Sequence, residues 1–337
     1  MTVRVGVVGA GNIGQDHIGR LAERLRGAAV VAVADADAAR AEAAARRVPA
    51  ASVCATGQEV IGRPDVDAVV VTTAGAAHEE FVLSAIEAGK PVFCEKPLAT
   101  SAAACQRIIA AELASRRRLV QVGFMRRFDA GYRAMKRAIE DGQIGRPLVV
   151  HCAHRNASVP PTFTSEMIIN DSAVHEIDIS RWLLEEEIAA VQVLRPRRSS
   201  QAGPGLQDPQ VVVLESATGV LVIDELFVNC GYGYDIRCEV VGESGTVALG
   251  EGSELILRED GRRSGRVPAD WRERFGRAYD RELQEWLDAV AGGGATGPSA
   301  WDGYAAAAVA DACIESLETG QRTALRLDER PRLYAPA

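Results

Sequence analysis

The sequence has few lysines, few aromatic residues and no long apolar run, and these shortages exclude several classes of protein. Lysine occurs at only three positions, 90, 96 and 136, so few ammonium groups are available for chemistry. Acidic residues outnumber basic ones, 46 to 38, and no basic stripe or tail offsets that balance. A nucleic-acid partner is therefore not expected. No apolar run reaches membrane-spanning length, so we expect no membrane association.

The seven cysteines form no C-x-x-C pair and are scattered along the chain. An odd number of isolated cysteines, mostly within apolar runs, is typical of reduced and buried thiols. No charged segment followed by an apolar one precedes the first predicted strand, so a signal peptide is not expected. Together these features predict a cytoplasmic protein.

The first part of the chain alternates short apolar runs with helix-like stretches. The apolar runs are 3–8, 30–34, 68–72, 92–94 and 119–122, and the helical stretches are 13–25, 38–47, 79–88 and 101–115. Continuous apolar runs indicate strands that are buried on both faces. Repeated strand–helix–strand units predict a doubly wound parallel sheet, and hence an α/β Rossmann domain over residues 1–123.

The pattern changes after about residue 123. Strand-like stretches follow at 148–156, 188–196, 210–215, 220–228, 236–241 and 246–249, and helical ones at 131–141, 173–184, 280–291 and 301–317. Short glycine-containing turns join consecutive strands, which favours an antiparallel or mixed sheet. We predict an α+β domain over residues 124–337 whose last helices pack back toward the first domain.

Gly9, Gly11 and Gly14 follow the first predicted strand and open the first predicted helix. In such a turn the first glycine permits the tight bend, the second lets a pyrophosphate approach, and the third lets helix and strand pack. The helix N-terminus offers N–H groups and a positive dipole end to phosphates. We predict a dinucleotide site that includes Asn12 and Ile13, with a ligand-free glycine turn as the alternative.

The second predicted strand ends at Asp35. An acid about 20 residues beyond the glycines commonly hydrogen-bonds the ribose 2′-hydroxyl, and it repels a 2′-phosphate. Asp35 could instead cap the next helix, although Asp37 is the better candidate for that cap. Arg40 lies nearby and could meet a phosphate. We predict NAD as the cofactor, with NADP as the alternative.

Lys96 follows the fifth predicted strand, within the segment Cys94-Glu95-Lys96-Pro97. Ligands bind beyond the carboxyl ends of the strands in such sheets. An ammonium group there can hydrogen-bond a substrate hydroxyl and favour its alkoxide. A surface lysine paired with Glu95 is the alternative.

Asp171 and His175 are four residues apart at the start of a predicted helix, and Asp178 lies a turn further along the same face. A carboxylate beside a histidine raises its basicity and fixes its orientation, which suits a general base that removes a hydroxyl proton. The alternative is that Asp171 caps the helix beside a half-exposed histidine.

His154 and Asn156 share one face of a predicted strand, and His151 lies on the other. A polar pair on an otherwise apolar strand indicates a wet cleft. The alternation separates the two histidines, and no third or fourth ligand is evident, so we expect no metal site.

Several segments together resemble the glucose–fructose oxidoreductase/inositol dehydrogenase (Gfo/Idh/MocA) family. The resemblance runs nearly from end to end. The lysine motif marks the wider family, whereas the histidine strand and the double-tyrosine segment are narrower. The segments that carry the resemblance are 93–100, 120–129, 151–156, 174–178, 228–235 and 297–304.

The resemblance implies an NAD-dependent oxidation of myo-inositol to its 2-keto form, with hydride transfer to C4 of the nicotinamide. It makes His175 the general acid/base, Lys96 the group that polarises the reacting hydroxyl, and Asp171 the group that orients the pair. It also implies a cis peptide before Pro97. The residues implied to hold the remaining hydroxyls are Arg126, His154, Asn156, Asp178, Tyr232 and Tyr234. The further residues implied to bind the cofactor are Thr72, Thr73, His78, Glu95 and Lys96.

The resemblance also implies a second domain with a large, open, mostly antiparallel sheet, and a homotetramer formed through that sheet. A related cyclitol, an aminocyclitol or a sugar such as glucose is the alternative substrate, because residues 74–76 depart from the inositol enzymes. A non-catalytic NAD-binding sensor is a second alternative. Such a sensor would not need Lys96, Asp171 and His175 together.

Overall fold

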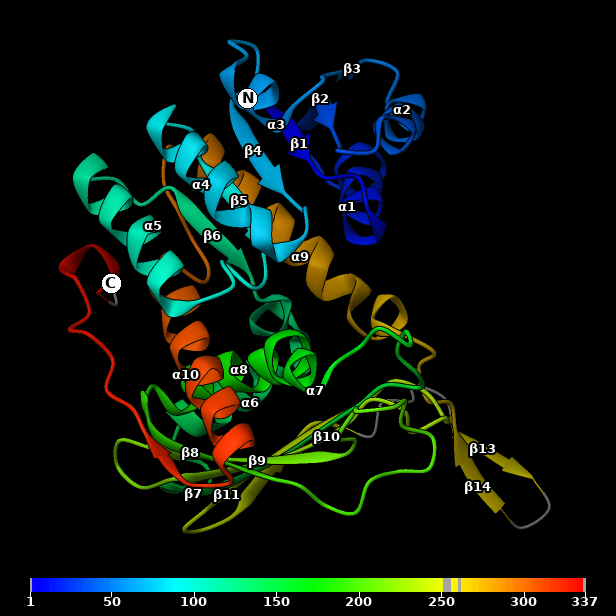
Figure 1. Cartoon of the computed structure of the whole chain (residues 1–337), viewed down its shortest axis with the longest axis vertical. Helices are drawn as coiled ribbons and strands as arrows, with labels where there is room; N and C mark the ends of the chain where they lie inside the picture. The colour runs from blue at the N-terminus through cyan, green and yellow to red at the C-terminus, as the bar shows by residue number, and fades with distance from the viewer. Residues whose placement is uncertain (1, 251–255, 260–261, 336–337) are drawn as a thin grey trace. The chain divides into compact units, whose positions relative to one another are not determined.

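The computed structural model describes residues 2–250, 256–259 and 262–335 of the 337-residue chain (Figure 1). Two units are distinguishable. The first contains the described residues up to Phe124, together with Tyr279–Ala307 and the described residues from Asp328 onward. The second contains the described residues of Met125–Ala278, together with Ala308–Leu327.

The first unit is built on a six-stranded parallel sheet with the order β3-β2-β1-β4-β5-β6. Its strands are β1 (Val3–Val8), β2 (Ala28–Ala34), β3 (Ser52–Val53), β4 (Ala68–Val71), β5 (Val92–Glu95) and β6 (Val120–Gly123). Every residue of β4, β5 and β6 is buried, as strands covered on both faces require. The predicted doubly wound sheet is confirmed.

Five helices connect these strands in chain order, namely α1 (Asn12–Glu23), α2 (Ala38–Arg47), α3 (Gly57–Gly62), α4 (His78–Glu87) and α5 (Ala102–Ser115). Asp37 caps α2 by accepting a hydrogen bond from the backbone N–H of Ala39, as predicted. The sequence analysis missed β3 and α3. Elements of two and six residues are too short to show a period.

The second unit contains a seven-stranded sheet with the order β12-β11-β7-β10-β9-β8-β15. Its strands are β7 (Pro147–Arg155), β8 (Ile188–Leu194), β9 (Gln210–Ser216), β10 (Leu221–Phe227), β11 (Asp235–Gly242), β12 (Thr246–Ala248) and β15 (Thr323–Ala324). Neighbouring strands run antiparallel except β7 and β10, which are parallel. The predicted mostly antiparallel sheet is confirmed. A separate hairpin pairs β13 (Ile256–Glu259) with β14 (Arg262–Gly265).

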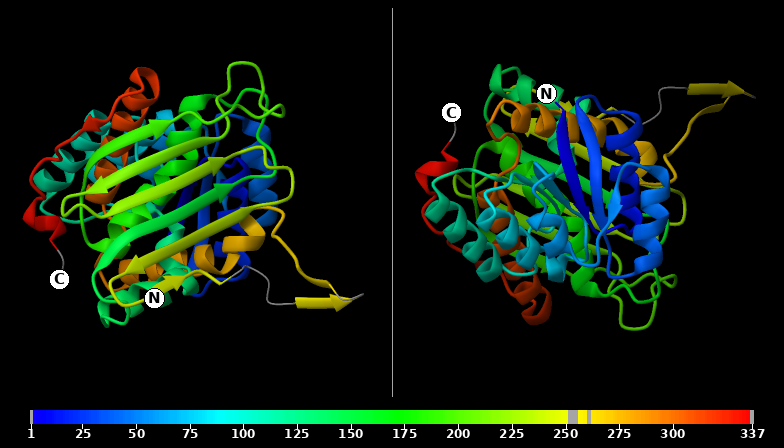
Figure 2. Two further views of the ribbon diagram at one scale, coloured as in Figure 1. Left: turned by 90° about the horizontal axis from the view of Figure 1, so that it is seen from below. Right: turned by 90° about the horizontal axis from the view of Figure 1, so that it is seen from above.

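One face of the seven-stranded sheet is covered by helices and the other is open (Figure 2, left). Residues along β9 and β10 alternate between buried and more exposed positions, as the two faces require. The helices on the covered side include α6 (Ala130–Glu140) and α8 (Val174–Leu184). The last turns of α10 (Ala300–Thr319) also pack there, because Ser316 Oγ accepts a hydrogen bond from the backbone N–H of Val193 at 2.9 Å.

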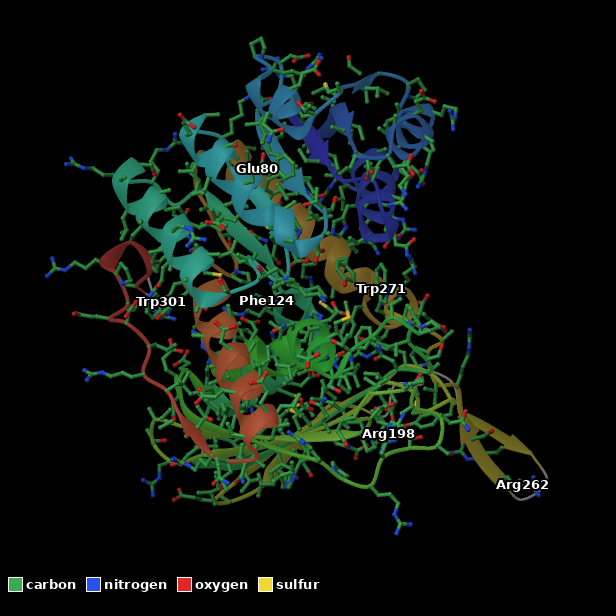
Figure 3. The ribbon with its side chains drawn as sticks, in the orientation of Figure 1. Glu80, Phe124, Arg198, Arg262, Trp271 and Trp301 are labelled. Carbon is green, nitrogen blue, oxygen red and sulfur yellow. The ribbon has the colours of Figure 1, made fainter. Side chains whose placement is uncertain are left out.

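Helix α9 (Trp271–Ala291) begins well before residue 280, where the sequence analysis placed its start (Figure 3). Charged residues and Gly276 obscure its first turns in the sequence. Phe275 and Ala278 are nevertheless buried, so these turns have an apolar face. All seven cysteines are free thiols and six are buried, as predicted. Among the described helices, none is long and apolar enough to cross a membrane.

Candidate active site

The glycine turn after β1 is shaped by close backbone packing. Gly9 has φ +101°, and a Cβ there would lie 2.6 Å from the backbone of Thr72 and Thr73. A Cβ at Gly14 would lie 2.3 Å from the carbonyl oxygen of Gly9, so helix and strand meet at this point. A Cβ at Gly11 would meet no atom within 4 Å. The turn is therefore tight where it contacts protein and open at its middle glycine, as a pyrophosphate-binding turn requires.

Helix α1 begins at this turn without a side-chain cap. Gly11 is the N-cap and supplies no side-chain hydrogen bond, and no acidic residue lies in the first turn. The side chain of Asn12 is exposed there and Ile13 is partly exposed. Free N–H groups at the positive end of a helix dipole bind phosphate. These features fit the two phosphates of a dinucleotide.

Asp35 lies directly after β2 and is fixed beside the glycine turn. Its Oδ2 accepts a hydrogen bond from the backbone N–H of Ala10 at 2.6 Å, and its Oδ1 accepts one from that of Asp37 at 2.8 Å. Arg40 is paired with Asp37 at 3.4 Å. A fixed carboxylate beside the turn suits a ribose 2′-hydroxyl, and the nearby cation is already paired. The site thus fits NAD.

Thr72 and His78 were predicted to contact the cofactor, and in the structure both contact backbone carbonyls of the protein. Thr72 Oγ1 donates to the carbonyl oxygen of Gly9 at 2.7 Å. His78 is buried with Nδ1 2.7 Å from the carbonyl oxygen of Pro97 and Nε2 3.0 Å from that of Thr73. Both ring nitrogens thus face backbone carbonyls. Burial lowers the pKa of His78, which favours the neutral ring.

Lys96 follows β5, and the predicted cis peptide before Pro97 is present. The Glu95 carboxylate accepts a hydrogen bond from the backbone N–H of Lys96 at 3.1 Å and one from Nε2 of His17 at 2.7 Å. The sequence analysis missed His17. Its position in the sequence could have revealed it, because His17 lies three residues after Gly14 and therefore on the buried face of α1.

In the second unit, Asp171 and His175 lie where a helix changes its winding. The chain forms a π-helical segment over Ile168–Ala173 and continues as α8 from Val174. The start of this helical run is capped by Thr164, so Asp171 is not an N-cap. Its side chain is exposed, whereas His175 is buried. Short π segments are frequent at functional sites.

A buried triad lies beside His175. Arg126 and Glu176 form an ion pair with both side chains 1% exposed. Nδ1 of His154 lies 3.0 Å from Oε2 of Glu176 and 3.1 Å from a guanidinium nitrogen of Arg126. Burial opposes ionisation of Glu176, but Arg126 and His154 outweigh it and lower the pKa of that carboxyl. The triad therefore holds an ionised carboxylate next to His154.

The triad fixes which nitrogen of His154 has the proton. An ionised carboxylate can only accept hydrogen bonds, so Nδ1 must be the donor to Glu176. The same carboxylate also accepts a hydrogen bond from Nη1 of Arg126. In a neutral His154 ring, Nε2 is left as an acceptor. The ring lies 6.2 Å from that of His175 and 5.7 Å from that of Tyr234, measured between centroids.

Asn156 and Tyr234 add polar atoms near His154. Asn156 lies two residues beyond His154, and its Oδ1 is buried with no donor among the described residues. A buried acceptor without a donor is costly, and a ligand hydroxyl would satisfy it. Burial raises the pKa of Tyr234 to about 12, although Arg126 opposes the shift, so its hydroxyl remains a donor. Segments around residues 154, 175 and 234 thus meet within this unit.

Two predicted substrate residues are held in buried ion pairs. Arg126 is paired with Glu176 as described above, and Asp178 accepts two hydrogen bonds from Arg127, one of them at 2.9 Å. Both carboxylate oxygens of Asp178 are therefore engaged. Glu176 and Arg127 were missed by the sequence analysis, because a charged pair that is buried together leaves no periodic signature.

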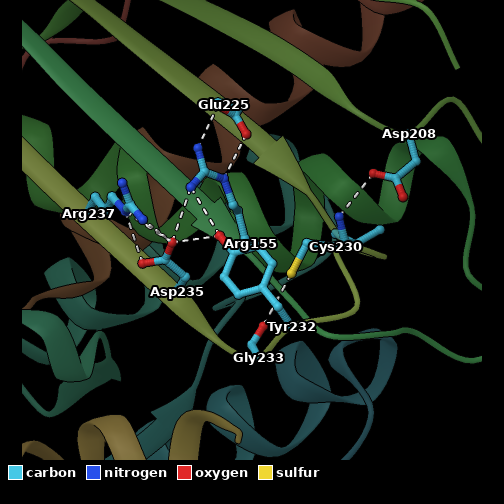
Figure 4. Close-up of polar contacts among 9 residues, drawn as sticks. Arg155, Asp208, Glu225, Cys230, Tyr232, Gly233, Asp235 and Arg237 are labelled. Atoms are coloured by element: carbon cyan, nitrogen blue, oxygen red, sulfur yellow. Dashed lines mark hydrogen bonds and ion pairs between the residues drawn. The ribbon is translucent and has the colours of Figure 1, made fainter. Parts of the chain in front are cut away.

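Tyr232 lies among Arg155 and Asp235 (Figure 4). The residue is 50% exposed, and its hydroxyl donates to Asp235 at 2.7 Å and accepts from Arg155 at 3.1 Å. Arg155 also pairs with Glu225. Arg155 and His154 are consecutive on β7 and point to opposite faces of the sheet. The structure therefore does not bring the Tyr232 hydroxyl to the face that His154 occupies.

Comparison with known proteins places this geometry in a family. One family model, described as an oxidoreductase family with an NAD-binding Rossmann fold, matches residues 3–124. A second, described as the C-terminal alpha/beta domain of an oxidoreductase family, matches residues 136–325. The two models together match most of the chain.

Relatives match the whole chain. It is 55% identical over 334 residues to inositol 2-dehydrogenase 3 of Saccharopolyspora erythraea, covering 99% of this chain and 98% of that protein. It is 52% identical over 335 residues to inositol 2-dehydrogenase of Burkholderia cenocepacia, covering 99% of each. A crystal structure of myo-inositol dehydrogenase from Lactobacillus casei, in complex with NAD(H) and myo-inositol, matches with a TM-score of 0.97 and 41% identity, over 99% of this chain and 100% of that one. The chain therefore belongs to the Gfo/Idh/MocA oxidoreductase family, and its first domain is an NAD-binding Rossmann fold.

Proposed function

We propose that this protein is an NAD-dependent inositol 2-dehydrogenase that oxidises myo-inositol to 2-keto-myo-inositol (scyllo-inosose). The observation that carries the proposal is the full-length likeness to an enzyme solved with both NAD(H) and myo-inositol. The buried acceptors around His154 support a substrate with many hydroxyls. The alternative within the family is another cyclitol or a sugar.

The oxidation removes a hydride from a ring carbon and a proton from the hydroxyl on that carbon. NAD, when bound, accepts the hydride at C4 of its nicotinamide. In the proposed mechanism His175 accepts the hydroxyl proton as general base, and Lys96 stabilises the oxygen as negative charge develops on it. The Asp171 carboxylate orients and tunes His175. The products are the ketone, NADH and one proton.

The remaining ring hydroxyls need partners, because a buried hydroxyl without one costs about 1–3 kcal/mol. The proposal assigns Nε2 of His154 and Oδ1 of Asn156 as acceptors, and the Tyr234 hydroxyl as a donor. Arg126 and Asp178 then contribute through their ion pairs, by holding His154 and the short 3-10 helix Met125–Phe128 in place. Acceptors at fixed positions favour hydroxyls and disfavour carbonyls at the same carbons.

A substrate panel tests the proposal. Purified protein is assayed with myo-inositol, scyllo-inositol, chiro-inositol and glucose, each with NAD and with NADP, by following absorbance of the reduced cofactor. We expect the highest kcat/KM with myo-inositol and NAD. A wide margin for glucose or scyllo-inositol would correct the substrate. Binding of NADH without turnover of any polyol would favour the sensor alternative.

We further propose that the protein forms a homotetramer through the open face of its seven-stranded sheet. Val211, Val213 and Ile223 are only partly buried on that face, and Leu221 is 39% exposed. Partly exposed apolar side chains on adjacent strands favour association. Light scattering after gel filtration should give four times the chain mass. The substitution Ile223→Asp should dissociate the assembly, and a monomeric wild type would refute it.

We place the protein in the cytoplasm. Its seven cysteines are all free thiols, which fits a compartment that keeps thiols reduced. Fractionation of cells that produce the protein, followed by immunodetection, tests this location. Recovery from the extracellular or periplasmic fraction would contradict it.

A further inference from the structure

Lys96 lies between two residues that are each held by a buried histidine of the first unit. On one side, Glu95 accepts a hydrogen bond from His17 of α1 at 2.7 Å. On the other, the carbonyl oxygen of Pro97 lies 2.7 Å from Nδ1 of His78, the first residue of α4. The two histidines are 0% and 1% exposed. No solvent therefore competes for either contact.

The contact with His17 passes directly to the Lys96 backbone. The Glu95 carboxylate uses its second oxygen to accept the backbone N–H of Lys96 at 3.1 Å. The carboxylate lies close to Gly123, where a Cβ would be only 3.1 Å from it, so a glycine leaves the room that it needs. The His17 ring is packed edge-on against Phe93, with centroids 5.7 Å apart. His17 thus fixes the residue before Lys96 from a well-packed position.

The contact with His78 depends on which ring nitrogen has the proton. Carbonyl oxygens only accept, and a neutral imidazole donates through one nitrogen. Two carbonyl oxygens could accept that proton. The oxygen of Pro97 lies 2.7 Å from Nδ1, and that of Thr73 lies 3.0 Å from Nε2. The shorter contact assigns the proton to Nδ1, so that His78 donates to Pro97. His78 thus fixes the residue after Lys96.

We infer that His17 and His78 are positioning residues that together fix the backbone on both sides of Lys96, and thereby the place of its ammonium group. Both also reach the cofactor site, since α1 starts at the glycine turn and Thr73 packs against Gly9. The same two histidines are therefore connected to both the glycine turn and the backbone around Lys96. The inference rests on the proposed role of Lys96 in the oxidation.

Replacements at His78 test the inference, because two amides mimic the two nitrogens separately. The amide nitrogen of asparagine lies near the place of Nδ1, and that of glutamine near the place of Nε2. We expect His78→Gln and His78→Leu to lower kcat about 100-fold, the usual effect of misplacing a catalytic group by about 1 Å. His78→Asn should recover most of that loss. KM for NAD should change little in all three variants.

A merely structural role for His78 predicts a different pattern. Asparagine and glutamine would then behave alike, and thermal stability would track activity. Val82→Ala on α4 is the matched control, since Val82 is also fully buried and lies one turn further along. It should lower Tm and leave kcat unchanged. A loss of NADH affinity in His78→Asn with normal kcat would overturn the inference, because His78 would then act on the cofactor.

The same design applies to His17. The substitution His17→Gln retains a donor for Glu95, whereas His17→Leu removes it and leaves the carboxylate buried. We expect kcat to fall about 100-fold in His17→Leu and to recover partly in His17→Gln. Equal activity of His17→Leu and wild type would refute the role of this residue.

Crystal structures of the NADH complexes separate failure of the inference from failure of the proposed function. The backbone of Lys96 should match wild type in His78→Asn and be displaced in His78→Gln and His17→Leu. If the wild type oxidises no polyol, the proposed function fails, and the Lys96 positions still decide the inference. An undisplaced Lys96 in every variant would overturn it.

Discussion

The two units hold their site residues by different physical means. In the first, backbone groups do most of the positioning, as where Asp35 accepts the N–H of Ala10 and Thr72 bonds the carbonyl of Gly9. In the second, buried ion pairs do it, as where Arg126 meets Glu176. The first unit is therefore positioned mainly through backbone groups, and the second through buried charges.

This difference has energetic consequences. A turn held by backbone hydrogen bonds tolerates the loss of one side chain at about 0.5–1.5 kcal/mol. A buried ion pair that loses one partner leaves a charge without compensation, at about 3–5 kcal/mol. The second unit should therefore be the more fragile half, in stability and toward acid, whereas the first should keep binding its cofactor when the second is damaged.

The largest expected effect separates the two halves. His175→Ala should lower kcat by about 10²–10⁴-fold, the usual contribution of a general base. NADH should bind to this variant as it does to wild type, because the cofactor contacts lie in the first unit. Steady-state assays and fluorescence titration with NADH measure the two effects. Unchanged turnover would refute the mechanism, and a parallel loss of NADH binding would show that the halves are not separable.

Breaking the buried triad should have the next largest effect. Glu176→Gln keeps the size of the side chain and leaves Arg126 without its counter-charge. We expect the free energy of unfolding to fall by about 3–5 kcal/mol and KM for inositol to rise. Urea unfolding and steady-state kinetics give these values.

The control for the triad is Glu225→Gln. Glu225 pairs with Arg155 on the open face of the same sheet, with 42% of its side chain exposed. An exposed pair contributes about 0–1 kcal/mol, so this variant should be close to wild type. Equal losses in Glu176→Gln and Glu225→Gln would contradict the importance of burial.

The third expected effect, on cofactor binding, tests the first unit. Asp35→Ala should weaken NAD binding about 10–100-fold, the value of a hydrogen bond to a charged group, and should weaken NADP less. Asp37→Ala is its control, since the Asp37 side chain caps α2 and pairs with Arg40 at the surface, and its loss should cost about 1 kcal/mol of stability. Titration with both cofactors measures the ratio. A wild type that already prefers NADP would show that Asp35 does not select the cofactor.

The same difference explains what the sequence could predict. The first unit was predictable because its strands are continuous apolar runs and its fingerprint occupies a few consecutive residues. Gly9, Gly14 and Asp35 need only a strand, a turn and a helix to come together. His17 was missed because its role appears only when the helix face is matched to Glu95, which is distant in sequence.

The second unit was predictable in its strands but less so in its site. Alternation placed His154 and Asn156 on one face of a strand, whereas β7 ends at Arg155 and Asn156 lies just beyond it. Pairing of Arg126 with Glu176 depends on three-dimensional packing, which no period encodes. The resemblance to a family supplied Tyr232 as a substrate residue, and the structure turns its hydroxyl toward Arg155 instead. Local sequence patterns thus predicted the helices and strands, whereas the partners of the buried charged residues became evident only from the packing.

Asp224 offers the test with the smallest expected effect on the second unit, and the most specific one. It lies on the covered face of β10, 1% exposed, and neither carboxylate oxygen has a hydrogen-bond partner among the described residues. Burial, and then the charge of Glu176, raise the pKa of Asp224 well above its ordinary value. The folded protein therefore keeps a proton there that the unfolded chain releases above about pH 4.

The sign of the pH effect follows from linkage. Above about pH 4 the unfolded state binds fewer protons at this position, so rising pH lowers the free energy of unfolding until the folded pKa is passed. The slope for one group is at most about 1.4 kcal/mol per pH unit. Asp224→Asn has no proton to lose, so its stability should fall less than that of wild type between about pH 5 and pH 8. Urea unfolding at several pH values measures both slopes. Parallel slopes in the two proteins would mean that Asp224 is ionised when folded and that a cation or ordered water compensates it, because an unpaired buried carboxylate could not otherwise keep its charge.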